Sequence, residues 1–152
     1  MSGDPVIAGG SAGFVRPAPQ PDPVSQGFWD AAARGELAIQ RCTGCGIYQH
    51  PPRPLCRRCG GTALRFEAVS GRGRLWGWSA AHHTALDRFR GVTPYTVLVV
   101  ELEEQKDLFL LSDLIGSEAG ELKLGMPMRA VFTDRAGDGL VLPQFEPMET
   151  RR

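Results

Sequence analysis

The chain has 152 residues, of which 42% are hydrophobic and 22% are charged. This length suits one domain, or a small domain with a satellite, and the composition excludes collagen-like, coiled-coil and fully disordered classes. No run of about 18 apolar residues is present, and the N-terminus lacks a basic region followed by an apolar stretch, so we expect a cytoplasmic protein with neither a membrane span nor a secretory signal. Lys+Arg and Asp+Glu are both 17, which argues against general electrostatic capture of nucleic acid.

The first 27 residues hold five prolines and five glycines but few large apolar side chains. A segment of this composition buries too little apolar surface to offset the entropy of ordering. We therefore expect residues 1–24 to form a flexible leader, either free or lying over the domain or a partner.

A short helix is expected to follow the leader. Ser25 is a suitable N-cap, Phe28 and Trp29 precede a run of alanines, and Gly35 is a suitable C-terminal cap. A helix of about two turns is marginal by itself. Phe28 and Trp29 should therefore pack against the adjoining core or against a partner protein.

Apolar runs separated by glycine and proline predict that the rest of the chain is mainly β. A brief strand is expected at residues 37–41. Later strands are expected at residues 73–82, 95–103, 108–114, 128–134 and 141–146, with one or two helical turns at 117–123. Five short strands with that interruption fit a small closed barrel of the OB type better than a sandwich.

Four cysteines form two C-x2-C pairs separated by ten residues: Cys42, Cys45, Cys56 and Cys59. Disulfides are unexpected in a chain without export signals. Two thiolates with two residues between them can bind one ion from a tight turn. A glycine follows each second cysteine and permits the backbone conformation that such a turn needs. Such a soft four-sulfur set selects zinc, or iron in a rubredoxin-like case.

A closed set of four thiolates leaves no coordination position for water or substrate, so the metal is predicted to be structural. Thioredoxin-like redox chemistry would need one C-x-x-C beside a βαβ pattern, which the sequence lacks. Metal binding would organise residues 40–65, which offer few core groups of their own. The chain thus divides into a leader (1–24), a helix with a zinc ribbon (25–66), an OB-fold (67–147) and a tail (148–152).

Charge is unevenly distributed along the neutral chain. Residues 34–74 hold eight arginines against two glutamates, whereas residues 101–125 hold seven acidic residues against two lysines. Arginine suits phosphate or carboxylate recognition because its planar fork donates two parallel hydrogen bonds. A basic ribbon beside an acidic barrel therefore predicts a polarised surface, although a plainly solvated surface explains any single arginine.

No convincing catalytic set emerges from the sequence. His82 and His83 end the first barrel strand, where paired histidines are more often surface features than catalytic bases. Trp76 and Trp78 are two residues apart and are therefore expected on the same side of that strand. They could form a stacking platform for bases or an adenine, or they could belong to the core or an interface.

Several motifs in a fixed order resemble the DUF35 family. They are Phe28-Trp29-Asp30, Gly35-Glu36-Leu37, Gln40-Arg41-Cys42, Pro51-Pro52-Arg53-Pro54-Leu55-Cys56, Val69-Ser70-Gly71-Arg72-Gly73, Pro94-Tyr95, Gly125-Met126-Pro127-Met128 and Leu142-Pro143-Gln144-Phe145. The resemblance spans about residues 28–147. It implies a short N-terminal helix, a rubredoxin-like zinc ribbon and a five-stranded OB-fold barrel, with Cys42, Cys45, Cys56 and Cys59 as metal ligands.

The resemblance further implies a non-catalytic accessory subunit of an acyl-CoA-processing complex. Its expected partner is a thiolase-superfamily enzyme (a thiolase or lipid-transfer-protein-like aldolase), with a hot-dog-fold hydratase as another possibility. Arg72 and Arg74 are candidate contacts for CoA phosphates, and the helix aromatics and the ribbon would dock the partner. Two alternatives remain open: a nucleic-acid-binding zinc-ribbon/OB module, disfavoured by the acidic barrel half, and an autonomous acyl-CoA enzyme using His82 or His83.

Overall fold

The computed structural model describes residues 19–85, 93–134 and 141–148. Residues 1–18 of the expected leader and residues 149–152 of the expected tail lie outside this part of the chain. The elements in chain order are α1 (Gln26–Ala33), β1 (Ala38–Cys42), β2 (Tyr48–Gln49), β3 (Leu64–Ala68), β4 (Arg72–Ala81), β5 (Tyr95–Leu102), β6 (Phe109–Asp113), the 3-10 helix η2 (Ala119–Glu121), β7 (Pro127–Asp134) and β8 (Val141–Pro147). The mainly β fold is confirmed, and each of the five barrel strands lies within one residue of its predicted bounds.

Helix α1 begins and ends near the predicted residues, but its N-terminus is built differently. The side chain of Ser25 does not cap the helix. Instead Asp22 accepts the backbone N–H of Ser25 at 2.7 Å through its carboxylate, and its carbonyl accepts the N–H of Gln26 at 2.8 Å. At the other end Gly35 has a φ of 75°, as predicted for a glycine that closes a helix.

The three-stranded sheet has the order β2-β1-β3 and carries the cysteine ribbon. Both outer strands pair antiparallel with β1, and β1 pairs with β3 from Ala38–Ala68 to Cys42–Leu64. The sequence pattern missed β2 and β3, because one is only two residues long and the other alternates weakly. Helix α1 packs against this sheet on its Gly27 side, where an added Cβ would lie 2.3 Å from the Phe66 ring.

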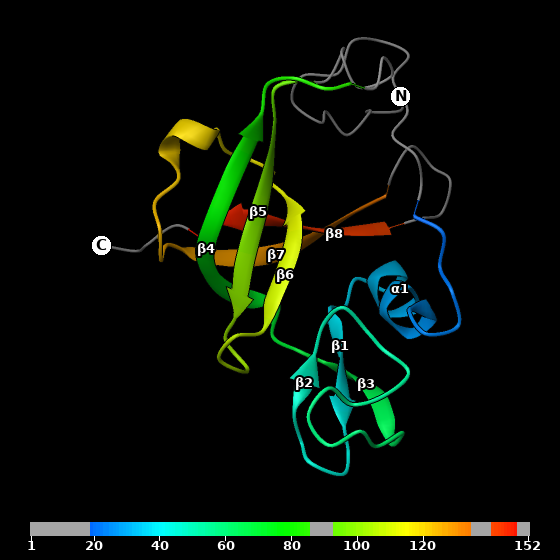
Figure 1. Cartoon of the computed structure of the whole chain (residues 1–152). Coiled ribbons are helices and arrows are strands. Elements are labelled where there is room, and N and C mark those ends of the chain that lie inside the picture. The colour runs from blue at the N-terminus through cyan, green and yellow to red at the C-terminus, as the bar shows by residue number, and fades with distance from the viewer. Residues whose placement is uncertain (1–18, 86–92, 135–140, 149–152) are drawn as a thin grey trace.

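The five-stranded sheet has the order β6-β5-β4-β7-β8 and curls until its two edges meet (Figure 1). A parallel bridge between Leu114 and Phe145 and the Ile115 N–H bond to the Phe145 carbonyl, at 3.0 Å, join the two edges. Pro143 has no N–H to offer the opposite strand, so the seam between β6 and β8 is only partly closed. This is the predicted OB-type barrel.

A β-bulge in β4 overturns the expectation that Trp76 and Trp78 face the same side. The pairing with β5 skips one residue, since Leu75 pairs with Val100 and Gly77 pairs with Val99. Trp76 is the extra residue, 60% exposed, and its ring lies 5.1 Å from the Phe109 ring on the outer face. Trp78 instead pairs with the buried Leu98 and so faces the interior side at the barrel end. The two rings therefore form no common stacking platform.

One hydrophobic core runs from the ribbon into the barrel. Phe28 of α1 and Ile39 of β1 belong to the same buried cluster as Leu98 and Phe145 of the barrel. Phe28 is thus buried inside the chain, which confirms the simpler of its two predicted roles. No helix within the described residues is long and apolar enough to span a membrane.

Candidate metal centre and adjoining groove

The two C-x2-C segments fold into matching turns. In the first turn Gly46 donates its N–H to the carbonyl of Cys42 at 2.8 Å, and in the second Gly60 donates to Cys56 at 2.9 Å. Both glycines have positive φ angles, 78° and 71°, which a side chain would strain. The repeated geometry follows from the repeated sequence, and it points two pairs of sulfurs toward each other.

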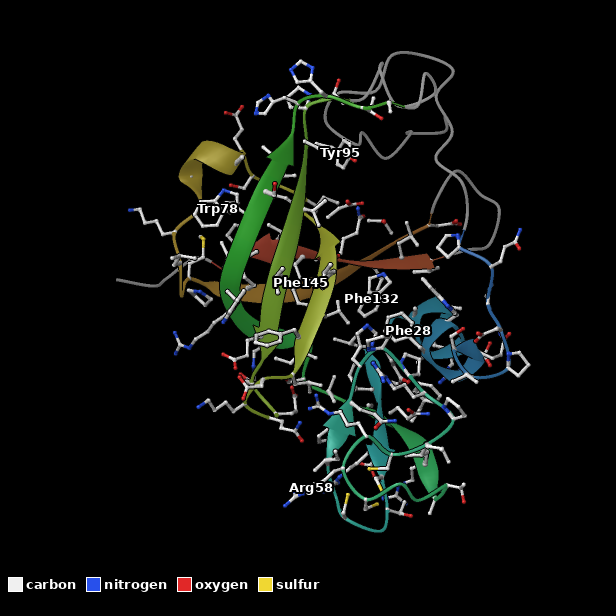
Figure 2. All side chains as sticks on the ribbon, in the orientation of Figure 1. Phe28, Arg58, Trp78, Tyr95, Phe132 and Phe145 are labelled. Carbon is white, nitrogen blue, oxygen red and sulfur yellow. The ribbon has the colours of Figure 1, made fainter. Side chains whose placement is uncertain are left out.

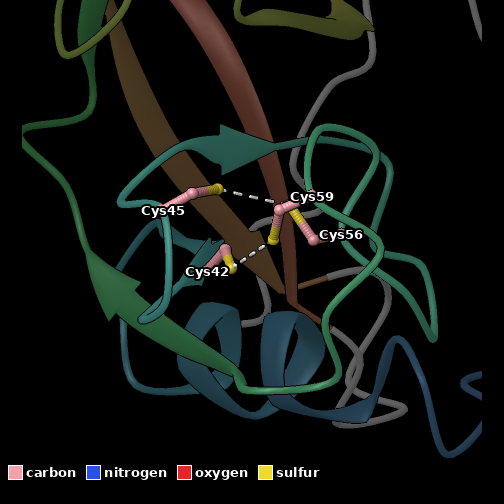
Figure 3. A group of neighbouring side chains, drawn as sticks. All are labelled: Cys42, Cys45, Cys56 and Cys59. Carbon is pink, nitrogen blue, oxygen red and sulfur yellow. Dashed lines mark hydrogen bonds between the residues drawn. The ribbon is translucent and has the colours of Figure 1, made fainter.

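The four sulfurs converge on one point (Figure 3). All of them lie within 4.8 Å of one another, and the Cys42–Cys59 and Cys45–Cys56 distances are both 3.6 Å. Four sulfurs about 2.3 Å from a central ion lie about 3.8 Å apart in a tetrahedron, so this spacing fits a bound metal. All four cysteines are free thiols rather than disulfides. They form a metal-binding group.

Backbone N–H groups favour the thiolate form at the deeper sulfurs. The N–H groups of Cys59 and Arg58 hold the pKa of Cys56 down at about 6. In the first turn the N–H groups of Cys45 and Gly44 lower the pKa of Cys42. Thiolates are the metal-binding form of cysteine, so these N–H groups favour that form at Cys56 and Cys42. At Cys59 the N–H of Gly61 acts in the same direction, but the neighbouring cysteine sulfurs outweigh it and raise the pKa to about 11.

Two buried glutamines hold the second cysteine turn to the sheet. Gln40 and Gln49 are 5% and 1% exposed, and the Gln49 Nε2 donates to the Gln40 Oε1 at 2.6 Å. The Gln40 Oε1 also accepts the N–H of Arg53 at 2.9 Å, and the Gln49 Oε1 accepts that of Arg57 at 2.9 Å. Gln49 Nε2 also donates to the Leu55 carbonyl at 3.2 Å. The sequence pattern missed this network because nothing in it marks these glutamines as buried.

Much of the predicted basic charge of the ribbon is compensated within the chain. Arg41 pairs with Glu67 at 2.9 Å, and Arg65 pairs with the same carboxylate. Hydrogen bonding from Arg41, joined by Arg65, outweighs the opposing effect of burial and lowers the pKa of Glu67. The basic stretch is therefore less uniform than its composition suggests.

The two arginines predicted to contact CoA phosphates lie side by side on one face of β4. Both alternate with the buried Gly73 and Leu75, so their side chains point outward. Arg72 forms an ion pair with Glu103 at 2.7 Å, whereas Arg74 donates from Nη1 to the carbonyl of Gly125 at 3.2 Å. Their contact with CoA stays a prediction. His82 and His83 follow β4 and are exposed.

A groove of about 560 Å³ lies between α1, residues 50–52 and the barrel seam. Its walls include Phe28 and Trp29 from the helix, His50, Leu111 from β6 and Pro143 from β8. The Phe28 and His50 rings are 5.3 Å apart, and burial lowers the pKa of His50 to about 4. His50 is therefore a neutral groove residue outside the four-sulfur cluster, and sequence reasoning did not foresee the groove because its walls come from distant segments.

A four-cysteine ribbon packed on an OB-type barrel defines the class of this protein as a zinc-ribbon/OB-fold protein. Family models agree: "ChsH2, rubredoxin-like zinc ribbon domain" matches residues 29–65 and "ChsH2, C-terminal OB-fold domain" matches residues 66–133. The chain belongs to this ChsH2 family, whose relatives also carry the DUF35 name, as the resemblance predicted.

Individual relatives fall into two groups. The chain is 35% identical over 121 residues to the "probable enoyl-CoA hydratase alpha subunit" of Thermomonospora curvata, covering 79% of this chain but 36% of that protein. It is 31% identical over 119 residues to a "DUF35 domain-containing scaffold protein" of Methanothermobacter thermautotrophicus, covering 74% of this chain and 86% of the relative. The chain thus spans about a third of the hydratase subunit and most of the scaffold protein.

Two solved structures resemble the chain, and both carry the DUF35 name. The chain resembles a chain of the "Ltp2-ChsH2(DUF35) aldolase" with a TM-score of 0.74 and 31% identity, covering 85% of this chain and 98% of that one. A DUF35-family protein of unknown function from Sulfolobus solfataricus, 13% identical with a TM-score of 0.57 over 83% of this chain and 86% of its own, shares the fold.

Proposed function

We propose that this chain is a non-catalytic subunit that binds and stabilises a thiolase-superfamily enzyme, a thiolase or lipid-transfer-protein-like aldolase, acting on acyl-CoA. The observation that carries the proposal is the likeness to a chain of the "Ltp2-ChsH2(DUF35) aldolase", over 98% of that chain. The scaffold name of the Methanothermobacter thermautotrophicus relative favours a structural rather than a catalytic role. The hydratase name of the Thermomonospora curvata relative makes a hot-dog-fold hydratase the second kind of catalytic partner.

In this proposal Cys42, Cys45, Cys56 and Cys59 hold one structural Zn²⁺. The ion would supply a four-way cross-link between two turns, because four thiolates complete a tetrahedral set. Residues around the cysteines would prepare the site and hold it in place. The backbone N–H groups favour the thiolate form of Cys56 and Cys42, and the buried glutamines tie the second turn to β1 and β2.

The groove supports partner binding beside the ribbon. Trp29 and Leu111 line it, and Leu111 is 68% exposed on the edge strand β6. Exposed apolar side chains along an open groove are typical of surfaces that another chain covers. Arg72 and Arg74 are our candidates for the CoA phosphates, since both point outward from β4.

Purification of the tagged chain from its native host, followed by mass spectrometry, tests the proposal. We expect one thiolase-fold or hydratase-fold chain to co-purify in a fixed ratio, and the reconstituted pair to turn over an acyl-CoA that the isolated chain leaves unchanged. Recovery of no such chain, or turnover of a thioester by the isolated chain, overturns it. Tight binding of an oligonucleotide with a steep salt dependence would favour the nucleic-acid alternative.

The CoA contact needs its own measurement. Replacing Arg72 and Arg74 by glutamine should weaken acyl-CoA binding to the reconstituted complex in calorimetry, by about tenfold. The matched control replaces Arg34 and Arg65, which are similarly exposed, lie outside the barrel and are paired with Glu36 and Glu67. Equal affinity in the two double variants would remove Arg72 and Arg74 from the CoA site.

A further inference from the structure

Three arginines at the second cysteine turn differ from the other arginines of the ribbon. We define the ribbon tip as Arg53, Leu55, Arg57 and Arg58; Figure 2 shows Arg58 reaching outward from the ribbon. Within residues 19–85, 93–134 and 141–148, the guanidinium groups of these three arginines have no carboxylate within ion-pairing distance, in contrast to Arg34, Arg41, Arg65, Arg72 and Arg129. Among the described residues the tip therefore holds three guanidinium groups without a carboxylate partner, and a Zn²⁺ bound by four thiolates would add a net charge of about −2 beside Arg57 and Arg58.

Metal binding does not require these charges, as the first turn demonstrates. The two residues between Cys42 and Cys45 are Thr43 and Gly44, whereas the matching positions of the second turn are Arg57 and Arg58. Arg58 contacts the Cys56 sulfur at 3.4 Å through its backbone N–H, which any residue other than proline would supply. The guanidinium groups are therefore available for another purpose.

An exposed leucine lies among these charges. Leu55 is 52% exposed between Arg53 and Arg57 in the sequence. Arginine with an apolar neighbour is typical of protein interfaces, where arginine is enriched among the residues that contribute most binding energy. A bare phosphate would offer nothing to this leucine, and three charges on a chain of zero net charge are few for a polyanion.

The tip is held in one conformation before any partner arrives. Gln40 and Gln49 hydrogen-bond the backbone at Arg53, Leu55 and Arg57, at 2.9, 3.2 and 2.9 Å, from a buried position. A surface that is already ordered loses less conformational entropy on binding. Exposure of Leu55 is thus a property of a fixed loop.

We infer that the ribbon tip is a docking surface for an acidic face of the partner polypeptide, with an apolar depression that receives Leu55. Charge complementarity selects the occupant, because three unpaired guanidinium groups attract carboxylates and repel another basic surface. The inference rests on the proposed function, since it takes the catalytic chain as the partner. It adds to that function which part of this chain contacts the catalytic chain, and it predicts a negative charge on the contacted face of the catalytic chain.

The test uses the full chain and the catalytic chain that co-purifies with it. Replacing Arg53, Arg57 and Arg58 by glutamine should raise the dissociation constant in calorimetry by about tenfold or more and flatten its dependence on salt. Leu55→Ser should weaken binding without changing the salt dependence. The matched control replaces Arg34, Arg65 and Arg129, which removes the same charge from exposed but paired positions and should change affinity by less than about twofold.

Metal content and melting temperature must match the wild type, so that lost binding reflects the surface and not unfolding. Unchanged affinity in the ribbon-tip variant, or an equal loss in the control, overturns the inference while the proposed function stands. Displacement of the partner by inorganic polyphosphate at the tip would assign the site to a phosphate ligand instead and also overturn it. If no catalytic chain co-purifies with the wild type, the proposed function fails and this inference fails with it.

Discussion

Gln105 holds the backbone of Tyr48 at both of its polar groups. The Gln105 Oε1 accepts the Tyr48 N–H at 2.8 Å, and the Gln105 Nε2 donates to the Tyr48 carbonyl at 3.1 Å. Gln105 lies in the β5–β6 turn of the barrel, whereas Tyr48 begins β2 of the ribbon. This side chain therefore completes the ribbon sheet from outside and joins the two halves of the protein.

Loss of this contact should be costly. Gln105→Ala leaves a partly buried N–H and carbonyl without partners, which costs about 1–3 kcal/mol. Chemical denaturation of the metal-bound protein measures the change in the free energy of unfolding. Gln26→Ala is the control, because the Gln26 side chain is exposed and its one bond within the described residues goes to Asp30 of its own helix, at 2.7 Å. Equal stability of the two variants would show that the Tyr48 contact contributes nothing.

Removal of the metal should unfold the ribbon before the barrel. The cysteine turns have few core groups, so a bound ion would supply a large part of their folding free energy, whereas Leu98, Val100 and Phe145 hold the barrel. Chelation, or Cys56→Ser, should broaden the amide signals of the ribbon in NMR and leave those of β5 in place. Metal analysis of the wild type should find one zinc or iron per chain. A ribbon unchanged by chelation would contradict a structural metal.

His50 should make stability depend on pH in the acidic range. Its pKa is about 4 in the folded chain because of burial, against 6.5 when exposed. As the pH falls, the unfolded chain therefore takes up a proton on His50 before the folded chain does. The contribution of neutral His50 to the free energy of unfolding is complete above about pH 6.5 and is lost as the pH falls toward 4. The loss amounts to at most about 3 kcal/mol.

The variant His50→Asn should remove this component of the pH dependence of the free energy of unfolding. His82→Asn is the control, because His82 is exposed. Asp113 is another titratable group in the groove wall and is kept in both variants. A pH profile that is the same in both variants would show that His50 is not the cause.

Gly27 offers a test in which two effects oppose each other. Glycine to alanine inside a helix normally stabilises by about 1 kcal/mol. Here the new Cβ would lie 2.3 Å from the Phe66 ring, so either that ring or α1 must shift. Overpacking of this kind costs about 1–3 kcal/mol, and we expect Gly27→Ala to lower the melting temperature. Adding Phe66→Leu should recover part of the loss; a more stable Gly27→Ala variant would contradict the packing of α1.

Local features of the fold were predictable from the sequence. The cysteine spacing predicted the four-sulfur cluster, because two identical turns need only neighbouring residues to form. The five barrel strands were found because their apolar runs are bounded by glycine and proline. Gly35 correctly predicted the end of α1, because a helix end of this kind depends only on local backbone geometry.

Features that join distant segments were decided by the tertiary structure. The bulge at Trp76 depends on how β4 pairs with β5, and it reversed the side to which Trp78 points. The buried role of Gln49 and the contact between Gln105 and Tyr48 depend on which backbone groups the folded ribbon leaves unpaired. Hydrogen bonds and burial between residues far apart in sequence carry no local signature. The amino-acid pattern therefore determined α1, the barrel strands and the metal cluster, while packing determined β2, β3, the groove and the ribbon tip.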